Sequence, residues 1–480
     1  MIPKRELLDI SATVGLSPNV VEKDYALGWA LAGIYAHQEL AELWVFKGGT
    51  CLKKCFFETY RFSEDLDFTL RDEGHLNHEF LARVFREISE WIYEQSGLEF
   101  PADSQSFDIY QNPRGKLSCQ GKLSYRGPIS PRSGGLPRIK LDLTADEHLA
   151  LPPVRVPIFH PYTDAPAEEI EVLAYAYEEA FAEKVRALAE RTRPRDLYDV
   201  VNLFRNTEAR PSSAVLLDVL AQKCAFKGIP VPRDGDLDRH LSDLEGAWGS
   251  MLAHQLPALP PVAAFWDALP EFFSWLADGQ ASRIPASYAL AQGDTIIRER
   301  TLRLPLHGSV QSYLEIIRFA AANRLCADLD YAGETRRIEP YSLRRTQEGN
   351  FILHAWNIDR DAHRSYRVDR IEGARTTNQV FVPRYEVELT PTGPVPVQDT
   401  QRSGHSGSST RRNSLPSLTR SRPQARPRTV SSSYGPTYVY QCGACGKKFR
   451  KKTASGQLGK HNTPAGYSCS SRIGYLIDTK

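Results

Sequence analysis

Asp65 and Asp67 stand one residue apart in the segment 63–70, SEDLDFTL, and their spacing could support chemistry. Side chains of a β-strand alternate between its two faces, so a strand here puts both carboxylates on one face together with Ser63. Two carboxylates a few ångströms apart repel each other unless a cation lies between them. Hard divalent cations such as Mg²⁺ take oxygen ligands and contact substrate phosphates. The segment therefore predicts a metal–nucleotide site, although an isolated Asp-x-Asp pair is more typical of a solvated strand face.

The elements before this segment would position a nucleotide against the carboxylates. Residues 43–46, LWVF, form a short apolar run that predicts a buried strand. The run leads into Gly48 and Gly49, whose missing side chains let backbone N–H groups approach a phosphate. A helix is predicted from Thr50 to about residue 60, so the loop would lie at a helix N-terminus, which favours anions. We expect nucleotide contacts from Lys47, Gly48, Gly49, Thr50 and Ser63.

A third carboxylate, Asp142, lies in the alternating segment 138–144, RIKLDLT. Three carboxylates on neighbouring strands could hold two Mg²⁺ ions and stabilise an in-line phosphoryl displacement on a nucleoside triphosphate. Asp142 could also help to deprotonate the attacking hydroxyl. Alone, Asp142 would be interpreted as a surface residue and the glycine pair as a turn. The order of strand, Gly-Gly-Thr loop, helix, Asp-x-Asp strand and later Asp strand favours a site.

Four separated motifs now point to a known family. Residues 20–25 (VVEKDY), 46–50 (FKGGT), 61–68 (RFSEDLDF) and 193–199 (RPRDLYD) resemble the AbiEii/AbiGii nucleotidyltransferase toxins. That family belongs to the DNA polymerase β-like nucleotidyltransferase superfamily and supplies the toxin of type IV toxin–antitoxin and abortive-infection systems. The resemblance covers roughly residues 1–270. The family's usual loop has Gly-Ser where this chain has Gly-Gly-Thr, which keeps a hydroxyl one position later.

The resemblance implies metal binding by Asp65 and Asp67 and association of Lys184 and Asp196 with activity. Lys184 lies on an otherwise apolar stripe of a predicted helix, where an unpaired ammonium is costly to bury. A nearby triphosphate or carboxylate would remove that cost, and snorkelling to solvent is the alternative. The catalytic candidates are Asp65, Asp67, Asp142, Lys184 and Asp196, whereas Asp199 and Arg195 are interpreted as structural ion-pair members.

Composition and charge describe the rest of the chain. A length of 480 residues predicts two to four domains. No run of eighteen apolar residues exists, and the first residues lack the apolar core of a signal peptide, so we expect a cytoplasmic protein with no membrane partner. Residues 393–480 carry 15 Lys/Arg against 2 Asp/Glu, although the whole chain has a net charge of only +2. This cationic tail favours a nucleic-acid partner, and a merely soluble tail is the alternative.

The tail divides into two parts. Residues 393–434 are rich in Ser, Arg, Pro and Thr, and we expect a disordered basic linker. Residues 435–480 resemble a zinc ribbon, in which Cys442, Cys445, His461 and Cys469 would complete a structural Zn²⁺ site. A Cys-x-x-Cys pair also permits redox chemistry, but so short a fold needs a metal or cross-link for stability.

Residues 288–390 predict a small antiparallel barrel preceded by a helix at about 310–324. The pattern resembles a WYL domain, an Sm-like barrel that senses ligands or nucleic acids in bacterial regulators. The naming tripeptide is absent, since Asn-Phe-Ile stands at 350–352 near its place. Arg337, Arg367 and Arg370 could face a phosphate or form ion pairs with Glu339 or Asp369.

Together these features predict an α+β protein: a polymerase β-like nucleotidyltransferase domain over 1–280 with a helical C-terminal part, a WYL-like barrel over 288–390, the linker and the ribbon. The resemblance implies Mg²⁺-dependent transfer of a nucleoside monophosphate from an NTP to RNA, with a tRNA 3′ end as the best candidate. It also implies a cognate antitoxin and a role in phage defence. One alternative is a nucleic-acid-binding regulator whose transferase body is inactive. Another is an active transferase whose acceptor is a protein.

Overall fold

The computed structural model describes residues 1–57, 61–130, 135–279, 294–297 and 308–389, followed by 438–442, 447–451, 457–458, 461, 469 and 474–479. The chain divides into two compact units, Met1–Thr400 and Gln401–Lys480. The predicted linker, 393–434, lies outside the described residues. Both helices and strands build the first unit, which confirms the α+β class.

Seven strands form the sheet of the transferase region. They are β1 (Trp44–Lys47), β2 (Asp65–Leu70), β3 (Ser106–Gln111), β4 (Leu117–Ser124), β5 (Arg138–Thr144), β6 (Val154–Pro157) and β7 (Glu171–Ala174). Their order in the sheet is β3-β4-β5-β2-β1-β7-β6. β2 pairs parallel with β5 and β1 parallel with β7, whereas the other neighbours are antiparallel. This order puts β2, with its two aspartates, at the centre.

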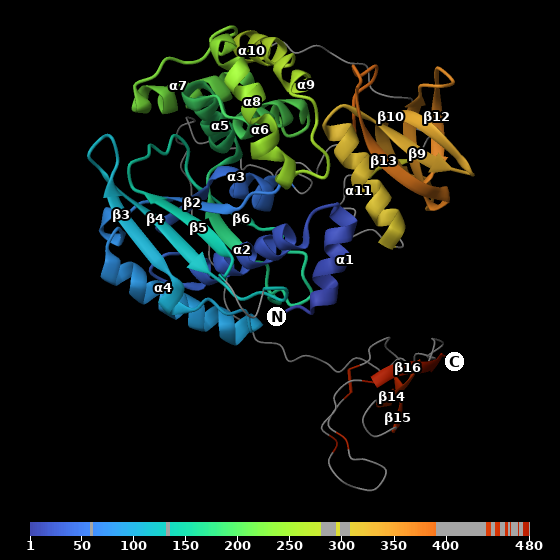
Figure 1. Ribbon diagram of the computed structural model, residues 1–480, viewed down its shortest axis with the longest axis horizontal. Coiled ribbons are helices and arrows are strands. Elements are labelled where there is room, and N and C mark those ends of the chain that lie inside the picture. The colour runs from blue at the N-terminus through green and yellow to red at the C-terminus, as the bar shows by residue number, and fades with distance from the viewer. Residues whose placement is uncertain are drawn as a thin grey trace, which may run out of the picture. The chain divides into compact units, whose positions relative to one another are not determined.

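Ten helices belong to the described part of this region. They are α1 (Lys4–Val14), α2 (Pro18–Ala36), α3 (Gly48–Cys51), α4 (His78–Ser96), α5 (Tyr177–Arg191), α6 (Pro194–Arg205), α7 (Ser213–Lys227), α8 (Leu241–Leu252), α9 (Ala263–Trp266) and α10 (Leu269–Asp278). Short 3-10 turns lie at Glu73–His75, Ala102–Ser104, Asp238–His240 and Ala253–Gln255. Figure 1 shows α5–α10 gathered on one side of the sheet and α4 on the other.

The turn after β1 differs from the predicted helix. The helix begins at Gly48 and continues as a π-helical turn, Leu52–Phe56, before the chain becomes extended at Phe57. Within this wider turn Lys53 and Lys54 both reach Asp24, with Nζ–carboxylate distances of 3.6 and 2.8 Å. In a regular α-helix two consecutive side chains point about 100° apart and would not both face one carboxylate. The wider π-helical turn therefore accompanies the ion pairs that Lys53 and Lys54 share with Asp24.

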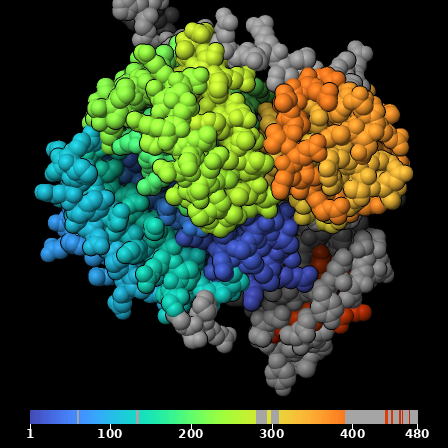
Figure 2. Space-filling view, turned by 45° about the horizontal axis from the view of Figure 1, so that its top comes forward, coloured from blue at the N-terminus to red at the C-terminus, as the bar shows by residue number. Residues whose placement is uncertain are grey.

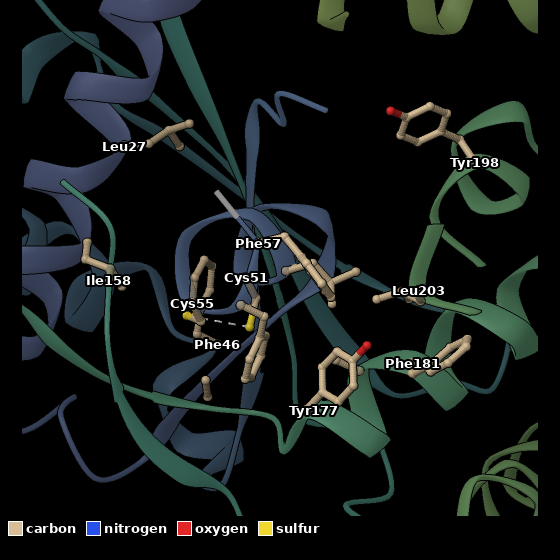
Figure 3. Packing of buried hydrophobic residues seen from close by; sticks show 14 of the residues in the cluster. Leu27, Phe46, Cys51, Cys55, Phe57, Ile158, Tyr177, Phe181, Tyr198 and Leu203 are labelled. Carbon is tan, nitrogen blue, oxygen red and sulfur yellow. Dashed lines mark hydrogen bonds between the residues drawn. The ribbon is translucent and has the colours of Figure 1, made fainter. Parts of the chain in front are cut away.

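Buried apolar side chains fasten the same turn to the sheet and to the helical region. Cys51 and Cys55 are buried thiols with their Sγ atoms 4.0 Å apart (Figure 3). The ring of Phe57 lies 5.8 Å from that of Tyr177, the first residue of α5. The glycine loop is therefore held between the central sheet and α5 by close packing.

A second sheet belongs to the first unit, and α11 (Gly308–Ala322) separates its first short strand from the other five. Its strands are β8 (Thr295–Ile296), β9 (Leu325–Tyr331), β10 (Glu334–Arg345), β11 (Phe351–Asn357), β12 (Ala362–Arg367) and β13 (Ile371–Val380), with a 3-10 turn at Val368–Arg370. The order is β12-β11-β10-β9-β13, and β8 pairs with β10. All pairs are antiparallel, as predicted for this region.

Two arginines of this sheet are engaged in ion pairs. Arg367 pairs with Asp369 at 2.7 Å, which confirms one of the two alternatives for that residue. Arg337 pairs with Asp328 at 2.8 Å rather than with Glu339. The partner on the neighbouring strand was not foreseen, because cross-strand register is set by pairings distant in sequence.

The described residues of the second unit form a three-stranded antiparallel sheet. Its strands are β14 (Tyr438–Cys442), β15 (Lys448–Lys451) and β16 (Gly474–Thr479), in the order β15-β14-β16. A small core contains Tyr440, Cys442, Leu458 and Cys469.

Candidate active site

The strand register brings the three predicted carboxylates to one face of the sheet. Asp67 on β2 lies directly opposite Asp142 on β5, and Asp65 is two residues before Asp67 on the same face. Burial raises the pKa of Asp67 to about 6, and the neighbouring Asp142 adds to the rise. Burial, followed by the charge of Asp65, also raises the pKa of Asp142. The three groups therefore repel one another across a shared space.

The glycine loop fits against these carboxylates so closely that side chains are excluded. Gly48 has φ +83°, and a Cβ built there would lie 2.1 Å from Oδ2 of Asp67. A Cβ at Gly49 would lie 2.8 Å from Nη2 of Arg61 and 3.1 Å from Oγ of Ser63. Glycine is therefore required at position 48 by its backbone and its contact with Asp67, whereas a larger residue at position 49 would displace the side-chain ends of Arg61 and Ser63.

Two other loop residues have structural contacts of their own. Thr50 is fully buried, and its hydroxyl donates a hydrogen bond to the backbone carbonyl of Asp65. Lys47 forms an ion pair with Glu147 at 3.4 Å. Thr50 thus ties the loop to the Asp-x-Asp strand, and its hydroxyl is occupied by that bond.

The start of α6 and the middle of α5 supply a buried network of ion pairs. Nζ of Lys184 lies 2.8 Å from Asp199 and 3.6 Å from Asp196. Arg61 makes a two-pronged contact with Asp199 at 2.7 and 2.8 Å, and Arg191 binds Asp196 in the same way at 2.7 and 3.0 Å. The carboxylates of Asp199 and Asp196 therefore explain why the charged Lys184 is tolerated on an otherwise apolar stripe of α5. The ion-pair role predicted for Asp199 is confirmed.

A cleft with a volume of about 360 Å³ lies above the carboxylates. Its lining includes seven of the predicted residues: Gly49, Ser63, Asp65, Asp67, Asp142, Lys184 and Asp196. The remaining predicted contacts, Lys47, Gly48 and Thr50, are not among the residues that line the cleft, although a Cβ at Gly48 would overlap Asp67. The structure thus gathers segments from β2, β5, the glycine loop and two helices around one space.

The cleft is also lined by residues that were not predicted as catalytic or nucleotide-binding. These are Arg61, Gln120, Gly121, Lys122, Lys140, Arg191, Arg193 and Arg195. Seven basic and four acidic side chains line the cleft, so its charge favours an anion despite the carboxylates. Arg195, predicted as an ion-pair member, has no ion pair among the described residues and contacts the carbonyl of Met251 at 3.4 Å. Arg61 and Lys140 lie inside sequence motifs described above and could have been predicted. The residues of β4 reach the cleft through the pairing of β4 with β5, and no local sequence pattern indicates that pairing.

The donor set fits a hard divalent cation. Asp65, Asp67 and Asp142 offer carboxylate oxygens only, and their mutual repulsion is relieved by a bound cation. These three residues would hold such an ion beside an anionic substrate in the cleft.

A second candidate metal centre lies in the C-terminal unit. The ligand atoms of Cys442, His461 and Cys469 all lie within 4.8 Å of one another, and the two Sγ atoms are 3.8 Å apart. Tetrahedral zinc with Zn–S bonds of about 2.3 Å puts two sulfurs about 3.8 Å apart. The donors therefore fit Zn²⁺, while Cys445 lies outside the described residues.

Comparisons with known proteins relate this chain to a family and to one solved structure. A family model described as "Nucleotidyl transferase AbiEii toxin, Type IV TA system" matches residues 29–277, and a WYL domain model matches 312–376. No curated protein matches the chain. Among solved structures, MenT4, a nucleotidyltransferase toxin from Mycobacterium tuberculosis H37Rv, is 19% identical, with coverage of 58% of this chain and 90% of that chain and a TM-score of 0.40.

No helix within the described residues combines the length and apolar character needed to cross a membrane.

The AbiEii model spans just over half of the sequence, and the WYL model follows it within the second sheet region. The chain therefore belongs to the AbiEii nucleotidyltransferase toxin family of type IV toxin–antitoxin systems, and it carries a WYL domain.

Proposed function

We propose that this nucleotidyltransferase moves a nucleoside monophosphate from an NTP to a hydroxyl of RNA, with a tRNA 3′ end as the acceptor, and that it depends on Mg²⁺. The observation that carries the proposal is the cluster of Asp65, Asp67 and Asp142 at the floor of a cleft with a basic lining. Neighbouring carboxylates on one face favour a metal-dependent reaction, and excess basic charge favours a polyanionic substrate.

The bonds that form and break in this transfer assign roles to the residues of the cleft. The acceptor oxygen forms a bond to the α-phosphorus, the bond from that phosphorus to the bridging oxygen breaks, and pyrophosphate leaves. Asp142 accepts the proton of the attacking hydroxyl. When bound, the divalent cation supplies charge neutralisation at the phosphates. Backbone N–H groups at Gly49 and the hydroxyl of Ser63 bind the triphosphate.

The ion-pair network holds the basic wall of the cleft in place. Asp199 fixes both Arg61 and Lys184, and Asp196 fixes Arg191. We assign the triphosphate to this wall together with Arg193 and Arg195, which stand at the start of α6. A cation already held in position loses little side-chain entropy when the nucleotide binds.

The family description implies an antitoxin partner, and we propose growth arrest or phage defence as the biological output. The WYL domain and the basic C-terminal unit, with its proposed structural Zn²⁺, would add nucleic-acid binding.

The test uses the purified full chain with Mg²⁺, each α-labelled NTP in turn, and either total RNA or cell protein. Asp67→Asn is compared with Asp103→Asn, which removes a carboxylate from an exposed turn outside the cleft. Label on RNA with wild type and Asp103→Asn, but not with Asp67→Asn, is expected. Label on polypeptide would replace the RNA acceptor by a protein acceptor. Absence of transfer by wild type under all conditions would refute the catalytic proposal.

A further inference from the structure

The face of the sheet that carries the catalytic carboxylates continues beyond them to the edge of the sheet. Asp65 on β2 is paired with Lys140 on β5, Lys140 with Lys122 on β4, and Lys122 with Ser106 on β3. Directly paired residues of neighbouring strands share a face. Lys140, Lys122 and Ser106 are exposed, so this row forms an open path from Asp65 to the edge strand.

The opposite face of the same strands is closed. Phe107 of β3 is buried with its ring 5.1 Å from Phe85 of α4. A Cβ at Gly121 would lie 3.1 Å from Leu141 and 3.2 Å from Phe107. The helix therefore covers one side of the strands, and the row of lysines occupies the other. In Figure 2 the cyan residues of this region border a hollow beside the green helical region.

The lysine pair is unusual in its charge. Lys122 and Lys140 stand directly opposite each other, an arrangement that is destabilising for like charges. Neither has a carboxylate within 4.0 Å among the described residues. The aspartate pair Asp67–Asp142 lies in the neighbouring row, on β2 and β5, and shares only β5 with the lysine pair. A pair of repelling carboxylates thus lies beside a pair of neighbouring ammonium groups, and a bound anion would relieve the repulsion between the two lysines.

An exposed aromatic ring completes the surface. Tyr110 on the edge strand β3 leaves 44% of its surface exposed. Gln120 is the cross-strand partner of Asp142 and lines the cleft. Strand β4 therefore lies between the strand of Tyr110 and β5, which carries Asp142. The exposed Asp108 separates Tyr110 from the lysine row on this face. Exposed aromatic rings bind single-stranded nucleic acids by stacking.

We propose that this open face, made by Lys140, Lys122, Gln120 and Tyr110, is the platform that binds the single-stranded end of the acceptor RNA. The inference rests on the proposed function and names the acceptor's path at that site. Phosphates of the acceptor contact the two lysines, and a base stacks on Tyr110. The strands are about 5 Å apart, so the lysine row begins one strand from Asp65 and leads outward to the sheet edge. The triphosphate occupies the other wall of the cleft, at Arg193 and Arg195.

The first test measures binding without catalysis. A short fluorescein-labelled single-stranded RNA of mixed sequence is titrated with the full chain at several salt concentrations, and fluorescence anisotropy is recorded. Lys122→Gln/Lys140→Gln is compared with Lys4→Gln/Arg86→Gln, which removes the same charge from exposed positions of α1 and α4. Loss of two phosphate contacts lowers the slope of log K against log salt by about 1.4. An equal slope in the two double variants would overturn the platform.

The second test separates this inference from the proposed function. In the transfer assay the lysine double variant is expected to raise KM for RNA by about tenfold or more, while the affinity for a non-hydrolysable NTP analogue is unchanged. Tyr110→Ala is expected to weaken RNA binding by about tenfold, whereas Tyr93→Ala, an exposed tyrosine on α4, is not. Transfer to RNA with unaltered KM in both platform variants would refute the platform and leave the proposed function standing. No transfer by wild type would refute the proposed function, while the anisotropy slopes would still decide whether this face binds RNA.

Discussion

Gly48→Ala tests the fit between the glycine loop and the carboxylate strand. The new Cβ would lie 2.1 Å from Oδ2 of Asp67, whereas real Cβ contacts are rarely below 3.0 Å. Rotation of the carboxylate cannot relieve this overlap, because Cγ and Cβ of Asp67 lie at only 2.9 and 3.1 Å. Asp67 or the loop must therefore move by about 1 Å, and a misplacement of that size at a reacting centre costs about a hundredfold in rate.

The same substitution also strains the backbone, and this effect needs its own control. Gly48 has φ +83°, and alanine in this region costs about 1–2 kcal/mol. Gly228, at the C-terminus of α7, has φ +70° with nothing within 4 Å of a Cβ built there. Gly228→Ala therefore shares the backbone strain without the overlap.

The assay compares transfer rates and urea unfolding of both variants with those of wild type. Both are expected to lose about 1–2 kcal/mol of unfolding free energy, with a further loss for Gly48→Ala from the overlap. Only Gly48→Ala is expected to lose about a hundredfold in transfer rate. A Gly48→Ala enzyme as active as Gly228→Ala would show that the position of Asp67 does not control the reaction.

Three further predictions concern charge and metal. Asp67→Asn is expected to raise the thermal unfolding midpoint measured in EDTA, because the substitution removes one of two repelling carboxylates. The same variant is expected to lose the rise in midpoint that Mg²⁺ and nucleotide give the wild type. A lower midpoint than wild type in EDTA would contradict the repulsion. Burial alone would raise the pKa of Asp199, but its two buried cationic partners hold it at about 2, below the ordinary value of 3.8. Its contribution to stability is therefore present above about pH 4 and lost as the pH falls towards 2. Asp199→Asn should flatten that acid limb in urea unfolding and cost about 3–5 kcal/mol at pH 7, and an unchanged acid limb would exclude this ion pair. Cys442→Ser is expected to abolish zinc binding, measured by metal analysis of the purified chain. Cys119→Ser replaces a buried thiol of β4 and is expected to retain zinc. Zinc retained by Cys442→Ser would reject the site.

Local patterns predicted the chemical groups of the site well. The alternation in 63–70 and 138–144 indicated two strands with carboxylates on one face, and the structure confirms both strands. Alternation is read from neighbouring residues and does not depend on the rest of the chain. The position of the glycines between a buried strand and a helical turn was likewise legible from a few residues.

Contacts between distant segments were not predictable in the same way. Arg61 lies 138 residues before its partner Asp199, and Nη1 of Arg61 also donates to Gln255 at 2.9 Å. The hydroxyl of Thr50 was expected at a phosphate, but it is bonded to the backbone of β2. Such assignments depend on which elements pack together, and a single sequence carries no record of that pairing.

The sequence by itself determined which residue types are present, their alternation on strands, the excess of basic charge in the tail and the family motifs. Only the tertiary structure decided that β5 lies beside β2 in a register that places Asp142 against Asp67 and Lys140 against Asp65. The reason is that a shift of one residue would turn every side chain of β5 to the other face, and packing of the whole sheet selects the register. The same packing placed Lys122 opposite Lys140 and created the open basic row beside the carboxylates.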